Sequence, residues 1–198
     1  IWNLLAGYGG LVSVGQQAFV GLGAYAMFAG VILLGWNPVW AILLGGLAAL
    51  VLAVPTAYFA FRLQGAYFAI GTWVIAEVTR LMIAQWKALG GGTGTSLPRE
   101  ATSNILGTDL IRALFSVREA AARDILAYWL ALVLAVAITG GIYWLLRNRL
   151  GLALAALRDN IDAAQSVGVD AVRLKWAVFM LAAAATGLVG GLVFMQTA

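Results

Sequence analysis

The side chains of this sequence that could perform chemistry are few, and the most unusual of them are Glu77 and Arg80. They lie three positions apart inside the otherwise apolar segment 65–86, and this spacing puts both on one face of a helix, where they can form an ion pair. A charged side chain at membrane depth is expected either to pair with a neighbour or to mark the path of a polar solute. Glu77 is therefore a candidate for a structural ion pair or for a polar contact in a translocation path.

A second group of polar side chains lies near the start of the chain, where glycines interrupt the helical pattern. Broken membrane helices expose backbone groups that can bind the carboxylate or the ammonium group of a zwitterion, whereas small residues alone also let helices approach closely. Both interpretations apply to the polar residues of this break, which are Ser13, Gln16 and Gln17. Three more residues could line the same path or could instead face lipid or the core: Tyr67, Phe68 and Thr72.

Enzymatic chemistry has little support in the sequence. Cysteine and histidine are both absent, which removes the thiolate nucleophile, the usual zinc and haem ligands and the usual general base. No lysine lies in a G-x-x-x-x-G-K-[ST] motif, so the sequence holds no P-loop for ATP. We therefore expect no catalytic residue, no metal site and no cofactor bound by this chain. The 12 basic residues form no patch, which argues against nucleic-acid binding.

The composition indicates a membrane environment. Of the 198 residues, 63% are hydrophobic and 10% are charged, against about 45–50% and about 25% in soluble domains. No charged residue precedes Arg62, and about 20 apolar residues are enough to cross a bilayer. Turn signals at Ser13 to Gln17 and at Gly35 to Pro38 divide this first run. The sequence therefore predicts an all-α, polytopic transmembrane bundle.

The spans follow from the charge-free segments. After an interrupted first helix and a span that ends near Gly35, we expect spans at 39–61, with a kink at Pro55, and at 65–86, 125–146 and from 176 onward. This gives about five spans. Because the chain is apolar at its first and last residues, residues 1–198 are expected to form one transmembrane domain that is truncated at both ends.

Two polar segments separate the later spans and bear on orientation. Residues 147–175 hold five basic residues, with Arg62 on the same side by parity, and residues 87–124 hold five on the other side. Basic residues are enriched in cytoplasmic loops, where they contact anionic lipid. Six against five is a small excess, and with the motif described below it predicts a cytoplasmic loop over 147–175 and an extracytoplasmic loop over 87–124. A short surface helix is expected over 109–123.

The segment 151–167 has the pattern of a short amphipathic helix. Apolar residues at spacings of three and four share one face, and charged residues and Gln165 occupy the other. Gly168 is placed to end the helix. Such a helix can lie on the lipid surface or enter a groove on a soluble partner, and the pattern fits both. The apolar face consists of Leu154, Leu157, Ile161 and Ala164.

The same segment carries a known signature. Asp162-Ala163-Ala164, followed by Gly168, resembles the E-A-A-x-x-x-G motif of permease subunits of ABC importers, with Asp in place of Glu and without the later proline. Residues 156–168 resemble the corresponding part of branched-chain amino acid permeases. Further stretches agree in the same order: 9–26, 62–70 together with Glu77, and 91–94. The resemblance spans essentially the whole chain and favours the LivM-type subunit over the paired LivH-type subunit.

The resemblance implies a role for each segment. The amphipathic helix would be the coupling helix that docks on a cytoplasmic ABC ATPase, and ATP and Mg would bind to that partner. Further partners would be a second permease subunit (a LivH-type homologue) and an extracytoplasmic substrate-binding protein. The cargo would be branched-chain amino acids or related amino acids, amides or urea, carried across the bacterial inner membrane. The coupling residues would be Leu157, Arg158, Ile161, Asp162, Ala163, Ala164 and Gly168.

The alternative is an ATP-independent secondary transporter or channel that uses Glu77 as an ion or proton site, since broken helices suit that class equally. The cytoplasmic helix separates the two hypotheses, because a secondary transporter has no need for it.

Overall fold

The structure is a computed structural model that describes residues 1–63, 65–86, 89–90, 105–115 and 118–197. Within this part of the chain all regular elements are helical, and five helices are long and apolar enough to cross a membrane: α1, α2, α3, α6 and α9. The predicted all-α polytopic fold is therefore confirmed. In chain order the elements are the π-helix η1 (Leu4–Tyr8), α1 (Gln16–Leu34), α2 (Pro38–Ala60), α3 (Ala66–Ala84), α5 (Thr108–Phe115), α6 (Glu119–Arg147), α7 (Arg149–Asp159), α8 (Ile161–Ser166) and α9 (Ala171–Thr197).

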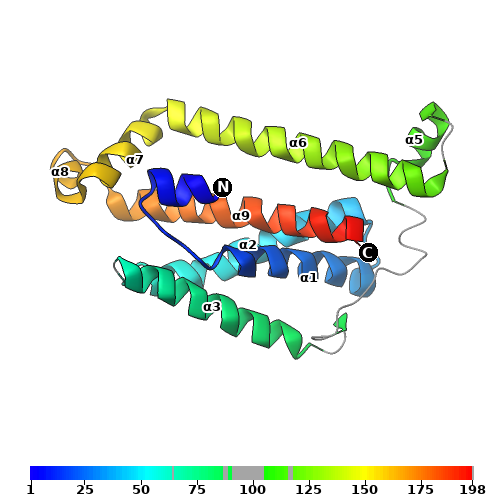
Figure 1. Cartoon of the computed structure of the whole chain (residues 1–198), viewed down its shortest axis with the longest axis horizontal. Coiled ribbons are helices and arrows are strands. Elements are labelled where there is room, and N and C mark those ends of the chain that lie inside the picture. The colour runs from blue at the N-terminus through cyan, green and yellow to red at the C-terminus, as the bar shows by residue number, and fades with distance from the viewer. Residues whose placement is uncertain (64, 87–88, 91–104, 116–117, 198) are drawn as a thin grey trace.

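The long helices run side by side and the connecting elements gather at the two ends of the bundle (Figure 1). The short helices α7 and α8 lie at the same end as the α2–α3 turn, which contains Arg62. The α1–α2 turn and α5 lie at the opposite end, where the Leu106 N–H donates to Asn37 Oδ1 at 3.2 Å. We name these the α8 end and the α5 end. Arg62 and the segment 147–175 therefore lie at the same end of the bundle, as the sequence predicts.

Three helices, α1, α2 and α9, form the packed centre, and glycines set their separation. A Cβ atom built on Gly45 of α2 would lie 2.7 Å from the Gly23 carbonyl oxygen and 3.0 Å from that of Gly187. The first distance is too short for a real side chain and the second is tighter than most real contacts, so the three backbones meet closely. Small residues are the usual means of such close approach in membranes. Gly187 and Gly191, four residues apart on α9, both lie at this contact.

The outer helices α3 and α6 are far less covered. Within the chain, 56% of the α9 span is buried, against 22% of the α3 span and 6% of the α6 span. Both outer helices carry large apolar side chains on their exposed faces, such as Trp73 and Trp144. These faces are available to lipid or to another membrane subunit.

Several predicted boundaries are wrong by a few residues. Helix α6 begins at Glu119, not at 125, because the alanines that follow Glu119 are strong helix formers. The surface helix expected over 109–123 is therefore limited to α5. Helix α9 begins at Ala171 and not at 176, since Asp170 Oδ1 accepts from the Arg173 N–H at 3.0 Å and caps it.

Some sequence features lie outside the described residues. They are Gln64, Lys87, Arg99 and the glycine-rich stretch 91–94.

Candidate coupling segment and translocation path

An interruption before the first spanning helix is present, as the sequence predicts, but it covers residues 9–15 and not Ser13 to Gln17, because Gln16 and Gln17 already belong to α1. After η1 the chain leaves helical geometry over residues 9–15 and enters α1 at Gln16. Backbone groups inside a bilayer must find partners within the protein, and several of this segment do. The Leu11 N–H donates to the Leu5 carbonyl at 2.9 Å, and the Val14 N–H donates to Thr72 Oγ1 of α3 at 3.2 Å. The break is thus tied to α3.

Two polar side chains at the break each have a buried atom without a hydrogen-bond partner in the described part of the chain. Gln16 Oε1 lies 3.2 Å from Thr186 Oγ1 of α9, whose hydrogen is shared with the Ala182 carbonyl at 2.6 Å, and Gln16 Nε2 has no partner within the described part of the chain. Ser13 Oγ is likewise buried and unpaired there. A buried polar atom without a partner is unusual and requires an explanation such as a water or a ligand. The break therefore offers polar groups to a solute.

The other residues predicted for a path fall into different surroundings. Thr72 and Phe68 are buried, and the Phe68 ring stacks on Phe61 at 6.1 Å. Tyr67 is 73% exposed and does not join them. Gln17 and Glu77 line one cavity between α1 and α3. The predicted path residues therefore divide between the break and this cavity.

The predicted ion pair in α3 is present. Arg80 Nε donates to Glu77 Oε2 at 2.9 Å, and Arg80 Nη2 donates to Glu77 Oε1, so the contact is bidentate. Paired guanidinium and carboxylate groups are the more stable way to place charge in a span. Glu77 is accordingly not an isolated carboxylate.

The predicted single helix over 151–167 is wrong, because the segment is two helices that meet at Asn160. The backbone of Asn160 is extended (φ −158°, ψ 113°), and its Oδ1 accepts from the Ala163 N–H at 3.0 Å. Asn is a strong N-cap because its side chain bonds the free N–H groups of a new helix. The continuous apolar spacing hid this signal, although Asn160 before an Asp-containing first turn is a recognisable helix start.

The extended backbone at Asn160 turns α8 relative to α7 and divides the predicted apolar face. Leu154, Leu157 and Ala164 are buried in the core, whereas Ile161 is 43% exposed. The exposed surface of this segment instead carries Asp162, Ala163 and Gly168, together with Val167, which is 78% exposed. Sequence analysis did not single out Val167, and Leu157, which was predicted as a coupling-helix residue, lies in the core.

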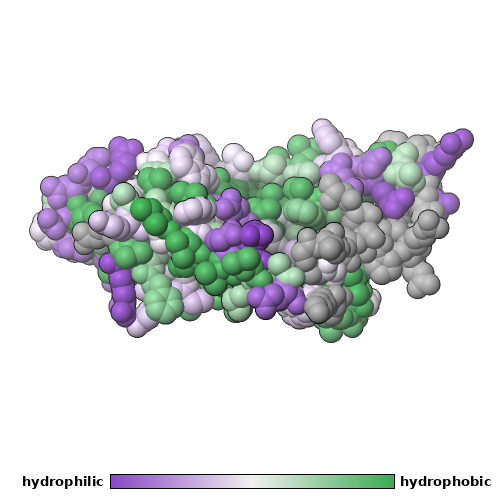
Figure 2. Space-filling view, turned by 60° about the horizontal axis from the view of Figure 1, so that its bottom comes forward, coloured by the Kyte–Doolittle hydropathy of each residue, from purple (hydrophilic) through white to green (hydrophobic). Residues whose placement is uncertain are grey.

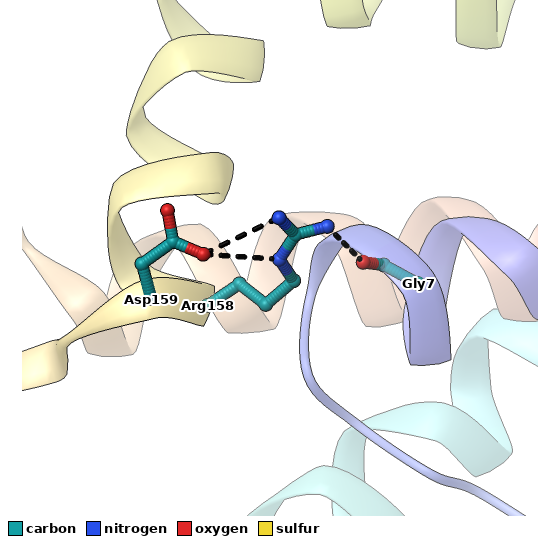
Figure 3. A network of polar contacts seen from close by, with 3 residues as sticks. All are labelled: Gly7, Arg158 and Asp159. Carbon is teal, nitrogen blue, oxygen red and sulfur yellow. Dashed lines mark hydrogen bonds and ion pairs between the residues drawn. The ribbon is translucent and has the colours of Figure 1, made fainter.

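Helix α7 contacts the π-helix that leads into the break. Figure 3 shows Arg158, which donates through Nη1 to the Gly7 carbonyl at 3.3 Å and also binds Asp159. Leu157 packs in the same core cluster as Leu4 and Leu5 of η1. A displacement of α7 would therefore act directly on η1.

A large cavity opens between α8 and the break. It measures about 820 Å³, and its lining includes residues from the break, the start of α3, α8 and the start of α9. Its polar lining is formed by Asp162, Gln165 and Lys175, and Leu11 and Val12 form the wall at the break. The break is thus accessible from the α8 end.

A bundle of apolar helices, one of them broken around unpaired polar groups and open to a cavity, is typical of polytopic membrane transport proteins. Comparison with known proteins identifies the family. Residues 2–198 match the family described as the permease component of branched-chain amino acid transport systems, and the chain belongs to that family.

Two curated relatives match nearly the whole chain. They are the high-affinity branched-chain amino acid transport system permease proteins LivM of Salmonella typhimurium and of Escherichia coli, each 31% identical over 204 residues. The alignments cover 96% of this chain and 47% of each relative, so the chain spans about half their length. No solved structure matches significantly.

Proposed function

We propose that this chain is a membrane-spanning permease subunit of an ABC importer, which moves branched-chain amino acids or related small amino acids, amides or urea inward. ATP and Mg would bind to separate cytoplasmic ATPase subunits, so the chain itself would not be an enzyme. The supporting observation is the α7–α8 segment, whose outer surface is exposed while its inner surface contacts the broken helix. The proposed location is the bacterial inner membrane, with the α8 end in the cytoplasm.

The contacts of α7 and α8 suggest how a displacement of α8 would be transmitted to the break at residues 9–15. An ATPase that binds the exposed surface of α8 would displace α7 and α8 together, because Leu157 and Ala164 anchor both helices in the same core. The displacement would reach η1 through Arg158 and through the packing of Leu157. Residues 9–15 follow η1 and are bound to α3 through Thr72, so the opening of the break would change with the position of α8. Such a two-state element is the physical requirement for coupling two sites.

The remaining partners are assigned by the same proposal. A second permease subunit, a LivH-type homologue, would cover part of the exposed faces of α3 and α6, and membrane lipid would cover the rest. An extracytoplasmic substrate-binding protein would dock at the α5 end. Both assignments rest on the family and on the uncovered surfaces.

Val167 provides the most direct test, because its apolar side chain is exposed at the proposed docking surface. The protein would be purified in mild detergent as wild type and as Val167→Asp, and co-purifying P-loop ATPases would be identified by mass spectrometry. Leu106→Asp is the matched control, since Leu106 is 56% exposed at the opposite end. We expect an ATPase with the wild type and the control, and a loss of about tenfold or more with Val167→Asp. Equal recovery of the ATPase with all three proteins, or no ATPase with any of them, would contradict the proposal.

The alternative, an ion-coupled transporter, has a separate test. It would be supported if the protein carried out uptake without any ATPase and Glu77→Gln abolished that uptake.

A further inference from the structure

The ion pair of α3 lines a cavity that is separate from the contacts between α7, η1 and residues 9–15. The cavity lies between α1 and α3 and measures about 450 Å³. Its polar lining consists of Gln17, Tyr25, Glu77, Thr79 and Arg80. Figure 2 shows that a hydrophilic patch interrupts the hydrophobic surface on the side of the molecule where α3 comes forward.

The position of the pair is unfavourable for contact with lipid tails. Glu77 lies about 10 Å from the α5 end of α3, counted along the helix axis. The side chains of Glu77 and Arg80 are 46% and 65% exposed within the chain. Charged groups in a span are rarely left against lipid and face a protein surface or a water-filled cavity. The face of α1 and α3 that bears the pair therefore lines water or a neighbouring subunit.

The contact between Glu77 and Arg80 uses only some of their hydrogen-bond donors and acceptors. The contacts with Glu77 involve Nε and Nη2 of Arg80, so Nη1 is not part of them. A carboxylate accepts about four hydrogen bonds, and two are made to Arg80. The guanidinium of Arg80 can thus donate to an anion while the carboxylate of Glu77 accepts from a cation. The bidentate contact holds the two groups in one plane.

This arrangement fits a dipolar ion better than a net charge. The pair is neutral overall, so a cation or an anion would find one partner and one repelling group, whereas a zwitterion places its ammonium on Glu77 and its carboxylate on Arg80. Urea and amides lack both charges. Small and apolar residues complete the lining, including Ala18, Gly21 and Ile83, and the volume lies within the usual range of small-molecule sites, about 300–1,000 Å³.

We propose that the Glu77–Arg80 pair is a binding site for the ammonium and carboxylate groups of a zwitterionic amino acid, with the apolar lining around the side chain. This inference rests on the proposed function and narrows its substrate class from amino acids, amides and urea to zwitterions. It also explains why the pair stays exposed to the cavity and is not covered by α1.

The test is uptake of radiolabelled leucine into proteoliposomes that contain the assembled complex. In the variant Glu77→Gln/Arg80→Gln, we expect leucine uptake to fall about tenfold or more. The control is Asp170→Asn/Arg173→Gln, which removes a second pair with the same spacing, joined at 3.0 Å at the start of α9 and outside the cavity. Its uptake should stay within about twofold of the wild type.

A charge exchange separates recognition from a purely structural ion pair. Glu77→Arg/Arg80→Glu keeps the pair but reverses its orientation in the cavity. The site predicts that uptake stays low although the complex assembles and hydrolyses ATP normally. Recovery of uptake to the wild-type level in this variant, or uptake within about twofold in the neutral variant, would overturn the inference. Neither result would affect ATPase binding at Val167, so the proposed function is tested separately.

Discussion

Replacing Gly45 by alanine tests the contact on which the whole bundle is built. The added Cβ would lie 2.7 Å from the Gly23 carbonyl oxygen, and ordinary contact begins near 3.4 Å. Helix α2 must therefore move away from α1 by about 0.7 Å, and a gap of about 0.5–1 Å forfeits about a quarter to a half of each dispersion contact. Overpacking of this kind costs about 1–3 kcal/mol.

Gly140 of α6 supplies the control, because nothing lies within 4 Å of a Cβ built there. Both substitutions gain the same helix propensity, about 1 kcal/mol, so the difference between them isolates the packing cost. We expect Gly45→Ala to be less stable than Gly140→Ala by about 1–3 kcal/mol.

The free energy of unfolding would be measured by titrating the protein in mixed micelles with SDS while following the fluorescence of its 8 tryptophans. A difference below about 0.5 kcal/mol between the two variants would refute direct backbone contact between α1, α2 and α9.

Three further substitutions test the path and the coupling segment. Thr72→Val should destabilise the fold by about 1–3 kcal/mol, because the Val14 N–H loses its acceptor; Thr72→Ser should restore stability. Leu157→Ala should cost about 2–5 kcal/mol, because the side chain is 3% exposed, while Leu152→Ala, at a position 75% exposed, should change the same unfolding measurement by less than about 0.5 kcal/mol. Asn160→Ala should remove the cap of α8 at a cost of about 0.5–2 kcal/mol and reduce ATP-driven uptake; Asn160→Asp, which retains a capping oxygen, should preserve uptake.

The sequence predicts the spans and the first break well, because charge-free length and glycine clusters depend on local composition. The Glu77–Arg80 pair follows from spacing alone for the same reason. These features need no knowledge of how the helices pack.

Features that depend on how the helices pack could not be predicted from local composition and spacing. The apolar spacing of 151–167 continues across Asn160, so periodicity predicts one helix where the cap makes two. Val167 follows α8 and is exposed, whereas Leu157 of α7 packs in the core, and only the tertiary arrangement distinguishes these two apolar residues. The division of the path residues between the break and the α1–α3 cavity likewise arises from the direction in which each helix faces.

The central claim is that a separate ATPase drives amino acid uptake through this chain by way of α8. The most direct measurement is leucine uptake into proteoliposomes reconstituted with the permease, the ATPase and the binding protein, with and without ATP on the ATPase side. The account predicts uptake that requires both ATP and the ATPase and that Val167→Asp reduces about tenfold. Leucine uptake without the ATPase, or uptake with ATP that is unchanged by Val167→Asp, would contradict it.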